Sequence, residues 1–442
     1  MGSYLIKNAT LVDGNTCESG VNVLIENEFI KKISNEDIVV DATTQVIDAT
    51  GKLLLPGVID DHVHFRDPGL THKADMLSET RAALAGGVTS FMDMPNTKPQ
   101  TTSLIEWENK MAIAQQKALV TYAFYIEATN ENLQELKQAD FSKIPGVKLF
   151  MGSSTGNMLV DDERSLDKIF SEIKTIIAVH CEDEQTIRKN LAIYKEKYGD
   201  EIPFSCHPNI RSEEACYKST SYAVDLAKKH HARLHVMHLT TEKELPFFTE
   251  SEDITAETCV NYLWFDDRAY DKRKGFVKCN PAIKKESDKL ALRKAVADGI
   301  IKVVATDHAP HLREEKEGNY VHSMSGCPTI QFSLLVMLEL AKQGCFSYSK
   351  VAEVMCNNPA SLFEIDKRGF VRENYYADLV LIDKNAQTVV TEDVILSKCG
   401  WSPFEGEQFS HKVTHTFVNG FLSYENGIVN ESSHAQALKF NR

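Results

Sequence analysis

Two histidines separated by one residue, His62 and His64, follow a short apolar run that contains Ile59. Residues two apart on a strand point to the same side, so both imidazoles can bind one metal ion. A His-x-His pair alone is a weak signal, because it matches by chance in many chains. Other apolar runs end in further potential ligands, which are His180, His238 and Asp307. Four run ends with imidazole or carboxylate groups predict a site for Zn²⁺ or a similar divalent ion.

Asp307 and Lys148 indicate chemistry beyond metal binding. A carboxylate in a poorly hydrated pocket beside a metal can move a proton between an attacking water and a leaving nitrogen, and a structural cap is the alternative role of Asp307. Lys148 lies inside the apolar run 145–151, where an unpaired ammonium is costly, so its pKa falls or it finds a partner. A neutral amine can react with CO₂ to give a carbamate that bridges two metal ions. From the residues alone, a salt bridge is the preferred interpretation of Lys148.

The elements that must position these groups repeat along residues 56–364. A short β-branched apolar run is followed by a polar turn and then by a segment of helical character. Eight such runs occur, at residues 57–60, 88–92, 119–126, 147–151, 176–179, 234–237, 254–258 and 301–305. Doubly buried strands separated by helices predict an α/β fold, namely a TIM-type (β/α)8 barrel with its catalytic face at the carboxyl ends of the strands. The histidines and Asp307 fall at that face.

The two ends of the chain, residues 1–55 and 365–442, follow a different pattern. They contain short alternating strands with Asn-Gly and Asp-Gly turns, which are typical of antiparallel hairpins. We expect both ends to pair as one composite β-sandwich domain beside the barrel domain of residues 56–364. Residues 314–319 are rich in charge and are expected to form a mobile loop. A loop that closes over substrate is expected at residues 153–157 or after His311.

The 442 residues contain 49 Lys plus Arg and 63 Asp plus Glu, a formal net charge of −14. This charge repels phosphate backbones and anionic membranes, which argues against nucleic acid and membrane partners. An anionic substrate therefore needs a local cluster of Arg, His and metal ions. The ten cysteines stand singly, and no apolar run approaches the roughly 18 residues of a membrane span. These features predict a reduced, cytoplasmic protein.

Two longer motifs contain these candidate residues. Residues 60–69, Asp-Asp-His-Val-His-Phe-Arg-Asp-Pro-Gly, and residues 305–311, Ala-Thr-Asp-His-Ala-Pro-His, resemble signatures of the amidohydrolase superfamily, and within it of the dihydroorotase family. The resemblance extends over essentially the whole chain. It implies two Zn²⁺ ions per subunit, bridged by carboxylated Lys148 and a hydroxide. The ligands that it implies are His62, His64 and Asp307 for the more buried ion, and His180 and His238 for the other. His235 competes with His238, but the family motif ends on the second histidine.

The same resemblance implies the contacts to a small-molecule substrate. Arg66, Asn96 and His311 would hold the α-carboxylate of dihydroorotate, because a guanidinium pairs bidentately with a carboxylate and the other two groups add hydrogen bonds. Without the motif, they would be a surface arginine, a turn-capping asparagine and a loop histidine. Asn280 and Cys327 lie where the family contacts the pyrimidine ring.

The implied activity is the reversible cyclisation of N-carbamoyl-L-aspartate to L-dihydroorotate plus water in de novo pyrimidine (UMP) biosynthesis. The bridging hydroxide would attack, Asp307 would act as general acid and base, and the family expectation is a homodimer. Hydantoinases, dihydropyrimidinases and allantoinases are the alternative, and they need no arginine at position 66. A catalytically inactive homologue that acts as a partner subunit is a third possibility, but such a chain should lose ligands, and all six are present. Val260 and Asn261 replace the Pro-His of the family pattern, which bears on subfamily placement.

Overall fold

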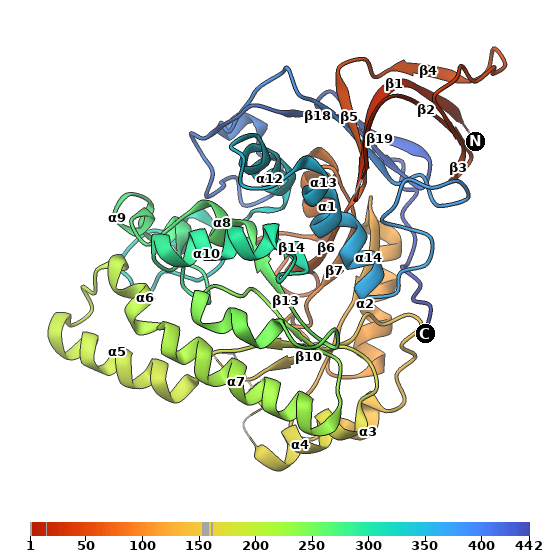
Figure 1. The fold of residues 1–442 in the computed structure, drawn as a ribbon. Helices are drawn as coiled ribbons and strands as arrows, with labels where there is room; N and C mark the ends of the chain where they lie inside the picture. The colour runs from red at the N-terminus through yellow and green to blue at the C-terminus, as the bar shows by residue number, and fades with distance from the viewer. Residues whose placement is uncertain (1, 15, 153–158, 161) are drawn as a thin grey trace.

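The structure is a computed structural model that describes all residues except 1, 15, 153–158 and 161. The closing loop expected at residues 153–157 therefore lies outside the described residues. Figure 1 shows the strands of the two chain ends gathered on one side of the molecule, with the helices α4 and α5 toward the opposite side.

One sheet joins the two ends of the chain. Its strands are β1 (Ser3–Asp13), β2 (Thr16–Glu26), β3 (Phe29–Ser34), β4 (Gln45–Asp48), β5 (Lys52–Pro56), β15 (Leu379–Asp383), β18 (Lys412–Val418), β19 (Phe421–Glu425) and β20 (Ile428–Val429). They run in the order β20-β19-β18-β15-β5-β1-β2-β3, with β4 on β1. The antiparallel pair β5–β15 connects the two termini. Asn419 and Gly420 have positive φ between β18 and β19, as a two-residue hairpin turn requires.

The middle of the chain supplies parallel strands that are buried on both faces. These are β6 (Val58–Val63), β7 (Val88–Asp93), β8 (Thr121–Phe124), β9 (Ile126–Glu127), β10 (Val147–Phe150), β11 (Ile177–His180), β12 (Leu234–Val236), β13 (Ile254–Cys259) and β14 (Val303–Ala305). One parallel sheet contains β6-β7-β8 and another contains β14-β13-β12-β11-β10-β9. Every apolar run predicted from the sequence overlaps one of these strands, and β6, β7, β11 and β13 extend beyond the end of the predicted run.

Two contacts bring the parallel sheets together. A parallel bridge pairs Val63, at the end of β6, with His308, which follows β14. Between β8 and β9, the Tyr125 N–H donates to the Asp93 carbonyl of β7 at 3.2 Å. The carboxyl ends of β6 and β14 therefore lie side by side, although their last residues, Val63 and Ala305, are 242 positions apart in the sequence.

The helices follow the parallel strands, as the sequence pattern indicates. They are α1 (Met76–Ala85), α2 (Leu104–Lys117), α3 (Leu133–Leu136), α4 (Glu163–Glu172), α5 (Glu184–Tyr198), α6 (His207–Ile210), α7 (Glu213–His230), α8 (Val260–Trp264), α9 (Ala269–Arg273), α10 (Glu286–Ala297), α11 (Arg313–Lys316), α12 (Ser333–Lys342), α13 (Tyr348–Ala352) and α14 (Asn358–Leu362). Asp75 caps α1, since its side chain accepts the Ser78 N–H at 3.0 Å. This cap fixes the start of the helix that carries Glu79.

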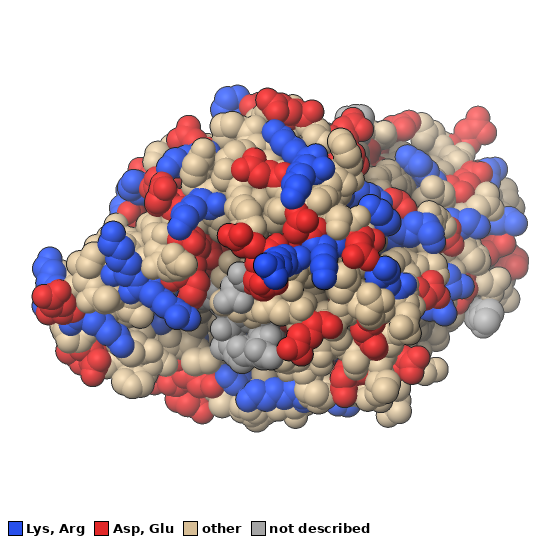
Figure 2. Space-filling model, turned by 90° about the horizontal axis from the view of Figure 1, so that it is seen from below, with Lys and Arg blue, Asp and Glu red and all other residues tan. Residues whose placement is uncertain are grey.

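The charged surface is mixed in sign. Figure 2 shows Lys and Arg side chains interspersed with Asp and Glu over the face seen from below. Among the described residues, none of the helices combines the length and the apolar character needed to cross a bilayer. The charge-rich residues 314–319 differ from the expected loop, because α11 covers 313–316 and the Lys316 side chain is buried.

Candidate active site

A cavity of about 310 Å³ lies at the carboxyl ends of the parallel strands. All but one of the predicted site residues line it, and these are His62, His64, Arg66, Asn96, Lys148, His180, His238, Asn280, Asp307 and His311. Lys73, Lys98, Phe150 and residues 324–326 complete much of the wall. The fold thus gathers side chains from distant parts of the sequence into one polar pocket.

One group of potential ligands contains His62, His64 and Asp307. His62 Nε2 lies 3.3 Å from Asp307 Oδ1, and His64 Nε2 lies 3.0 Å from the same oxygen. Asp307 has a φ of 46°, a left-handed conformation that few non-glycine residues adopt. Burial raises the pKa of Asp307, but the imidazoles of His62 and His64 bring it below its ordinary value. The side chain is therefore a carboxylate that can bind a cation or accept a proton.

A second group of potential ligands contains His180 and His238. His180 Nδ1 lies 2.8 Å from His238 Nε2, and burial lowers the pKa of both imidazoles. His238 Nδ1 is buried and has no hydrogen-bond partner among the described residues. Neutral imidazoles with free lone pairs are common metal ligands. This pair therefore fits a second cation position.

Three of these histidines have their other ring nitrogen held by a neighbouring side chain. The pairs are His62 Nδ1 with Glu257 Oε1 at 2.5 Å, His64 Nδ1 with Asn96 Oδ1 at 2.7 Å, and His180 Nε2 with Glu182 Oε2 at 3.1 Å. Partners of this kind fix the tautomer and the orientation of metal-binding imidazoles. The nitrogens toward the cavity are thus left as lone-pair donors, and the donor set fits a divalent metal.

Lys148 lies on β10 with 1% of its surface exposed. Its Nζ is 2.8 Å from Met237 Sδ and 4.7 Å from the centre of the Phe150 ring. Within the described part of the chain, Lys148 takes part in no ion pair, so the salt bridge considered from the sequence is not formed. Burial lowers the pKa of Lys148 to about 8. A fraction of the side chain is therefore a neutral, nucleophilic amine near neutral pH.

The structure distinguishes His235 from His238. His235 is fully buried, and its ring nitrogens lie 2.8 Å from Thr255 Oγ1 and 3.3 Å from Glu257 Oε2. His238 instead lines the cavity. His238 is consequently the ligand candidate, while His235 packs behind the strand end and helps to hold Glu257.

The cavity has a cationic end that contains Arg66 and His311. The Arg66 Nε donates to the Pro310 carbonyl at 3.0 Å, and Nη2 lies 3.1 Å from His311 Nε2. Asn96 uses its amide oxygen on His64, which leaves its NH₂ group as a donor. A guanidinium, an imidazole and an amide at one end of a pocket form a suitable site for a carboxylate.

The two predicted ring contacts have different positions. Asn280 lines the cavity, and its buried Oδ1 has no hydrogen-bond partner among the described residues. Cys327 does not line the cavity, because its Sγ points to the Phe276 carbonyl at 3.4 Å. The wall at this point is formed by the preceding Ser325 and Gly326. Asn261, one of the two departures from the family pattern, is buried outside the cavity lining.

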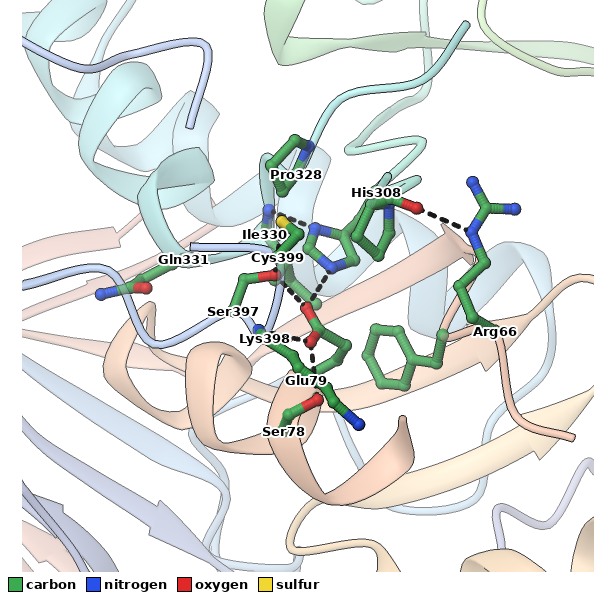
Figure 3. Close-up of polar contacts among 12 residues, drawn as sticks. Arg66, Ser78, Glu79, His308, Pro328, Ile330, Gln331, Ser397, Lys398 and Cys399 are labelled. Carbon is green, nitrogen blue, oxygen red and sulfur yellow. Dashed lines mark hydrogen bonds and ion pairs between the residues drawn. The ribbon is translucent and has the colours of Figure 1, made fainter. Parts of the chain in front are cut away.

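Sequence reasoning missed the support behind the strand ends, where Glu79 of α1 contacts His308. Figure 3 shows the buried Glu79 carboxylate facing the His308 ring, with Nε2 at 2.8 Å from Oε2. The same carboxylate accepts from the Ser397 hydroxyl at 2.5 Å and from the Lys398 backbone N–H at 3.1 Å. The His308 carbonyl in turn accepts the His64 N–H at 2.7 Å. Glu79 carries no sequence signal, because a single acidic residue on a helix has no diagnostic spacing.

Comparisons with known proteins agree with this geometry. Residues 53–422 match the amidohydrolase family. The chain is 31% identical to a dihydroorotase of Methanosarcina acetivorans, over 91% of this chain and 88% of that one. It is also 31% identical to a dihydroorotase of Aquifex aeolicus, over 96% of this chain and 100% of the other.

A solved structure shares the fold over almost the full length. The L-hydantoinase (dihydropyrimidinase) from Arthrobacter aurescens superposes with a TM-score of 0.94 at 26% identity, covering 99% of this chain and 100% of that chain. The family match and the identity to full-length relatives show that the chain belongs to the amidohydrolase family, within its dihydroorotase branch.

Proposed function

We propose that this chain is a dihydroorotase, an enzyme that interconverts L-dihydroorotate and N-carbamoyl-L-aspartate in pyrimidine biosynthesis. The observation that carries the proposal is the position of the cationic end of the cavity, formed by Arg66, His311 and the Asn96 amide, next to the histidines and Asp307. A cyclic amide with a carboxylate substituent would place its carboxylate at the cationic end and its amide bond beside the histidines and Asp307. Relatives of this chain that are named dihydroorotase support the same activity.

We also propose that the parallel strands close into a (β/α)8 barrel formed by residues 56–364. The bridge between Val63 and His308 supports closure at one junction. At the other junction, only Tyr125 separates β8 of one sheet from β9 of the other, so the chain continues directly from sheet to sheet. Residues 1–55 and 365–442 would form the composite β-sandwich domain, which the β5–β15 pairing supports. A cytoplasmic location and a homodimer remain predictions. The ten free cysteines agree with a reducing compartment.

The donor set suits two Zn²⁺ ions: His62, His64 and Asp307 would hold one, His180 and His238 would hold the other, and a carboxylated Lys148 would add a further anionic ligand. Bound zinc would lower the pKa of water and polarise the ring carbonyl. Lys148 is buried, lines the same cavity as both ligand groups and has no ion pair with any described residue, and these features support its modification.

The side chains of the cavity have different roles in hydrolysis. Arg66 and Asn96 hold the substrate carboxylate, which orients the ring amide toward Asp307. As water oxygen bonds to the amide carbon, Asp307 accepts the water proton, and it delivers this proton to the ring nitrogen while the C–N bond breaks. In the cyclisation direction, Asp307 takes the proton from the ureido nitrogen and returns it to the departing oxygen.

The alternative is a hydantoinase or dihydropyrimidinase activity, which the fold of the Arthrobacter L-hydantoinase favours. The test is to compare kcat/KM for L-dihydroorotate with the values for dihydrouracil, hydantoin and allantoin, together with metal content by elemental analysis. We expect a preference for L-dihydroorotate and about two zinc ions per chain, the number that two ligand groups can hold. A preference for an uncharged ring would refute the proposal, and a chain that purifies without metal and without turnover would indicate an inactive partner subunit.

A further inference from the structure

Lys73 is a buried cation at the cationic end of the cavity that the mechanism above does not use. It precedes α1 and lines the cavity, and 9% of its side chain is exposed. Its Nζ lies 3.1 Å from His311 Nδ1 and 2.6 Å from Glu315 Oε1. The ammonium is thus held between a carboxylate and one particular nitrogen of the histidine ring.

The contact with Lys73 determines which nitrogen of His311 carries the proton. An ammonium only donates hydrogen bonds, so Nδ1 must accept and the proton must reside on Nε2. The other side of the ring agrees, because Nε2 lies 3.0 Å from the Ser325 carbonyl, which only accepts. The nearest carboxylate oxygen to Nδ1, Glu315 Oε2, is 3.6 Å away, which is too long for a hydrogen bond.

This tautomer places two donors next to each other, the Arg66 guanidinium and the His311 Nε2–H, and the Nε2–H is shared with the Ser325 carbonyl. Arg66 Nη2 lies 3.1 Å from His311 Nε2, yet a guanidinium also only donates. Two N–H groups therefore face one another at the end of the cavity, with the Asn96 NH₂ as a further donor. An anion with two oxygens would satisfy them together, as a carboxylate does. Burial and the charges of Arg66, Lys316 and Lys73 hold the pKa of His311 well below its ordinary value, so the ring stays neutral.

We propose that Lys73 is a positioning residue for substrate specificity: it holds His311 with Nε2–H directed as a donor beside Arg66, which prepares the cavity for the substrate carboxylate. The inference rests on the proposed dihydroorotase function. Trp401 supports the same orientation, since its Nε1–H donates to the His311 carbonyl at 2.7 Å and fixes the backbone. The Lys73 ammonium contacts Glu315 and the His311 ring, so it links the carboxylate of α11 to the orientation of this ring.

The test is the variant Lys73→Met, which keeps the length and the apolar stem but removes the donor. We expect KM for L-dihydroorotate to rise about ten-fold, the effect of one hydrogen bond to a charged group, with little change in kcat. Turnover of dihydrouracil, which has no carboxylate, should stay unchanged. The conservative variant Lys73→Arg retains a donor-only cation and should restore most of the affinity.

Lys398→Met is the matched control. The Lys398 ammonium bonds Asp75 at 2.9 Å and the Thr71 carbonyl at 2.6 Å, so it holds the same segment without contacting His311. We expect the control to leave KM for L-dihydroorotate and the preference over dihydrouracil unaltered. A purely structural role of Lys73 would instead lower turnover of both substrates equally, and that result would overturn the inference.

The two proposals fail in different ways. If the unaltered enzyme prefers dihydrouracil, both the function and the inference are wrong. If it prefers L-dihydroorotate and Lys73→Met retains the parental KM, only the inference is wrong. Should Lys73→Met lose its cooperative thermal transition, Lys73→Gln is measured instead and judged by the same change in KM.

Discussion

The two ends of the cavity are built from different parts of the fold. The metal end (His62, His64, His180, His238 and Asp307) stands at or just after parallel strands, and three of its four imidazoles have a partner on the outer nitrogen. The cationic end (Arg66, His311 and the Asn96 amide) stands on loops. Backbone carbonyls hold Arg66 and His311 there, and the Lys73 ammonium contacts Nδ1 of the His311 ring. The difference suggests that chemistry depends on the strands and that substrate choice depends on the loops.

The largest effect is expected at the metal end, from Asp307→Asn. The amide cannot accept the proton, so kcat should fall by about 10²- to 10⁴-fold, the usual contribution of general acid–base catalysis. Steady-state kinetics with L-dihydroorotate measures the change, and elemental analysis should find metal content near the parental value. An Asn variant with full turnover would show that Asp307 is not the general acid and base. The assignment of the chemistry to the metal end would then be wrong.

A smaller effect is expected from Glu257→Gln, which weakens the group that orients His62. Loss of such a partner costs about 10- to 100-fold in metal affinity or activity. Zinc affinity is measured by competition with a chelator, and kcat is measured at saturating zinc. Glu244→Gln is the control, because Glu244 is also a buried carboxylate but bonds Thr220 and Thr241 outside the cavity. Equal losses in both variants would mean that Glu257 acts only through stability.

The smallest effect is expected at the cationic end, from Arg66→Lys. Lysine retains the charge but loses the bidentate fork, so KM for L-dihydroorotate should rise about ten-fold, while kcat changes less. Arg313→Lys is the control, since Arg313 pairs with Glu405 at 3.1 Å and does not line the cavity. A large fall in kcat with constant KM would show that Arg66 belongs to the chemistry, and the contrast between the ends would disappear.

The sequence predicted the strands and the metal end well. The histidine candidates and Asp307 follow runs of apolar residues, and the alternation of strand and helix determines that all such ends meet on one face. The same reasoning located Arg66 and His311, which lie within the two longer motifs.

The rest depends on partners that are distant in sequence. Glu79 meets His308 and residues 397–398 only in the folded chain, so its neighbours along α1 give no indication of its role. The Cys327 side chain does not line the cavity, because its thiol contacts the Phe276 carbonyl. Residues 314–319 looked like a mobile loop from their charge, yet the Lys316 ammonium donates to the carbonyls of Lys278, Met324 and Gly326 at 2.6 to 3.0 Å. The number of charged residues in a segment does not reveal that backbone carbonyls from other parts of the chain surround one ammonium.

The pairing of β5 with β15 also dictates the order of events during biosynthesis. On the ribosome, β5 leaves the exit tunnel before any of the parallel strands, whereas β15 is made after all of them. At roughly 5–20 residues per second, the edge of β5 waits on the order of tens of seconds for its native neighbour. An open strand edge is a template for wrong pairing between nascent chains. The last part of translation, and not the assembly of the cavity, therefore decides when this sheet is complete.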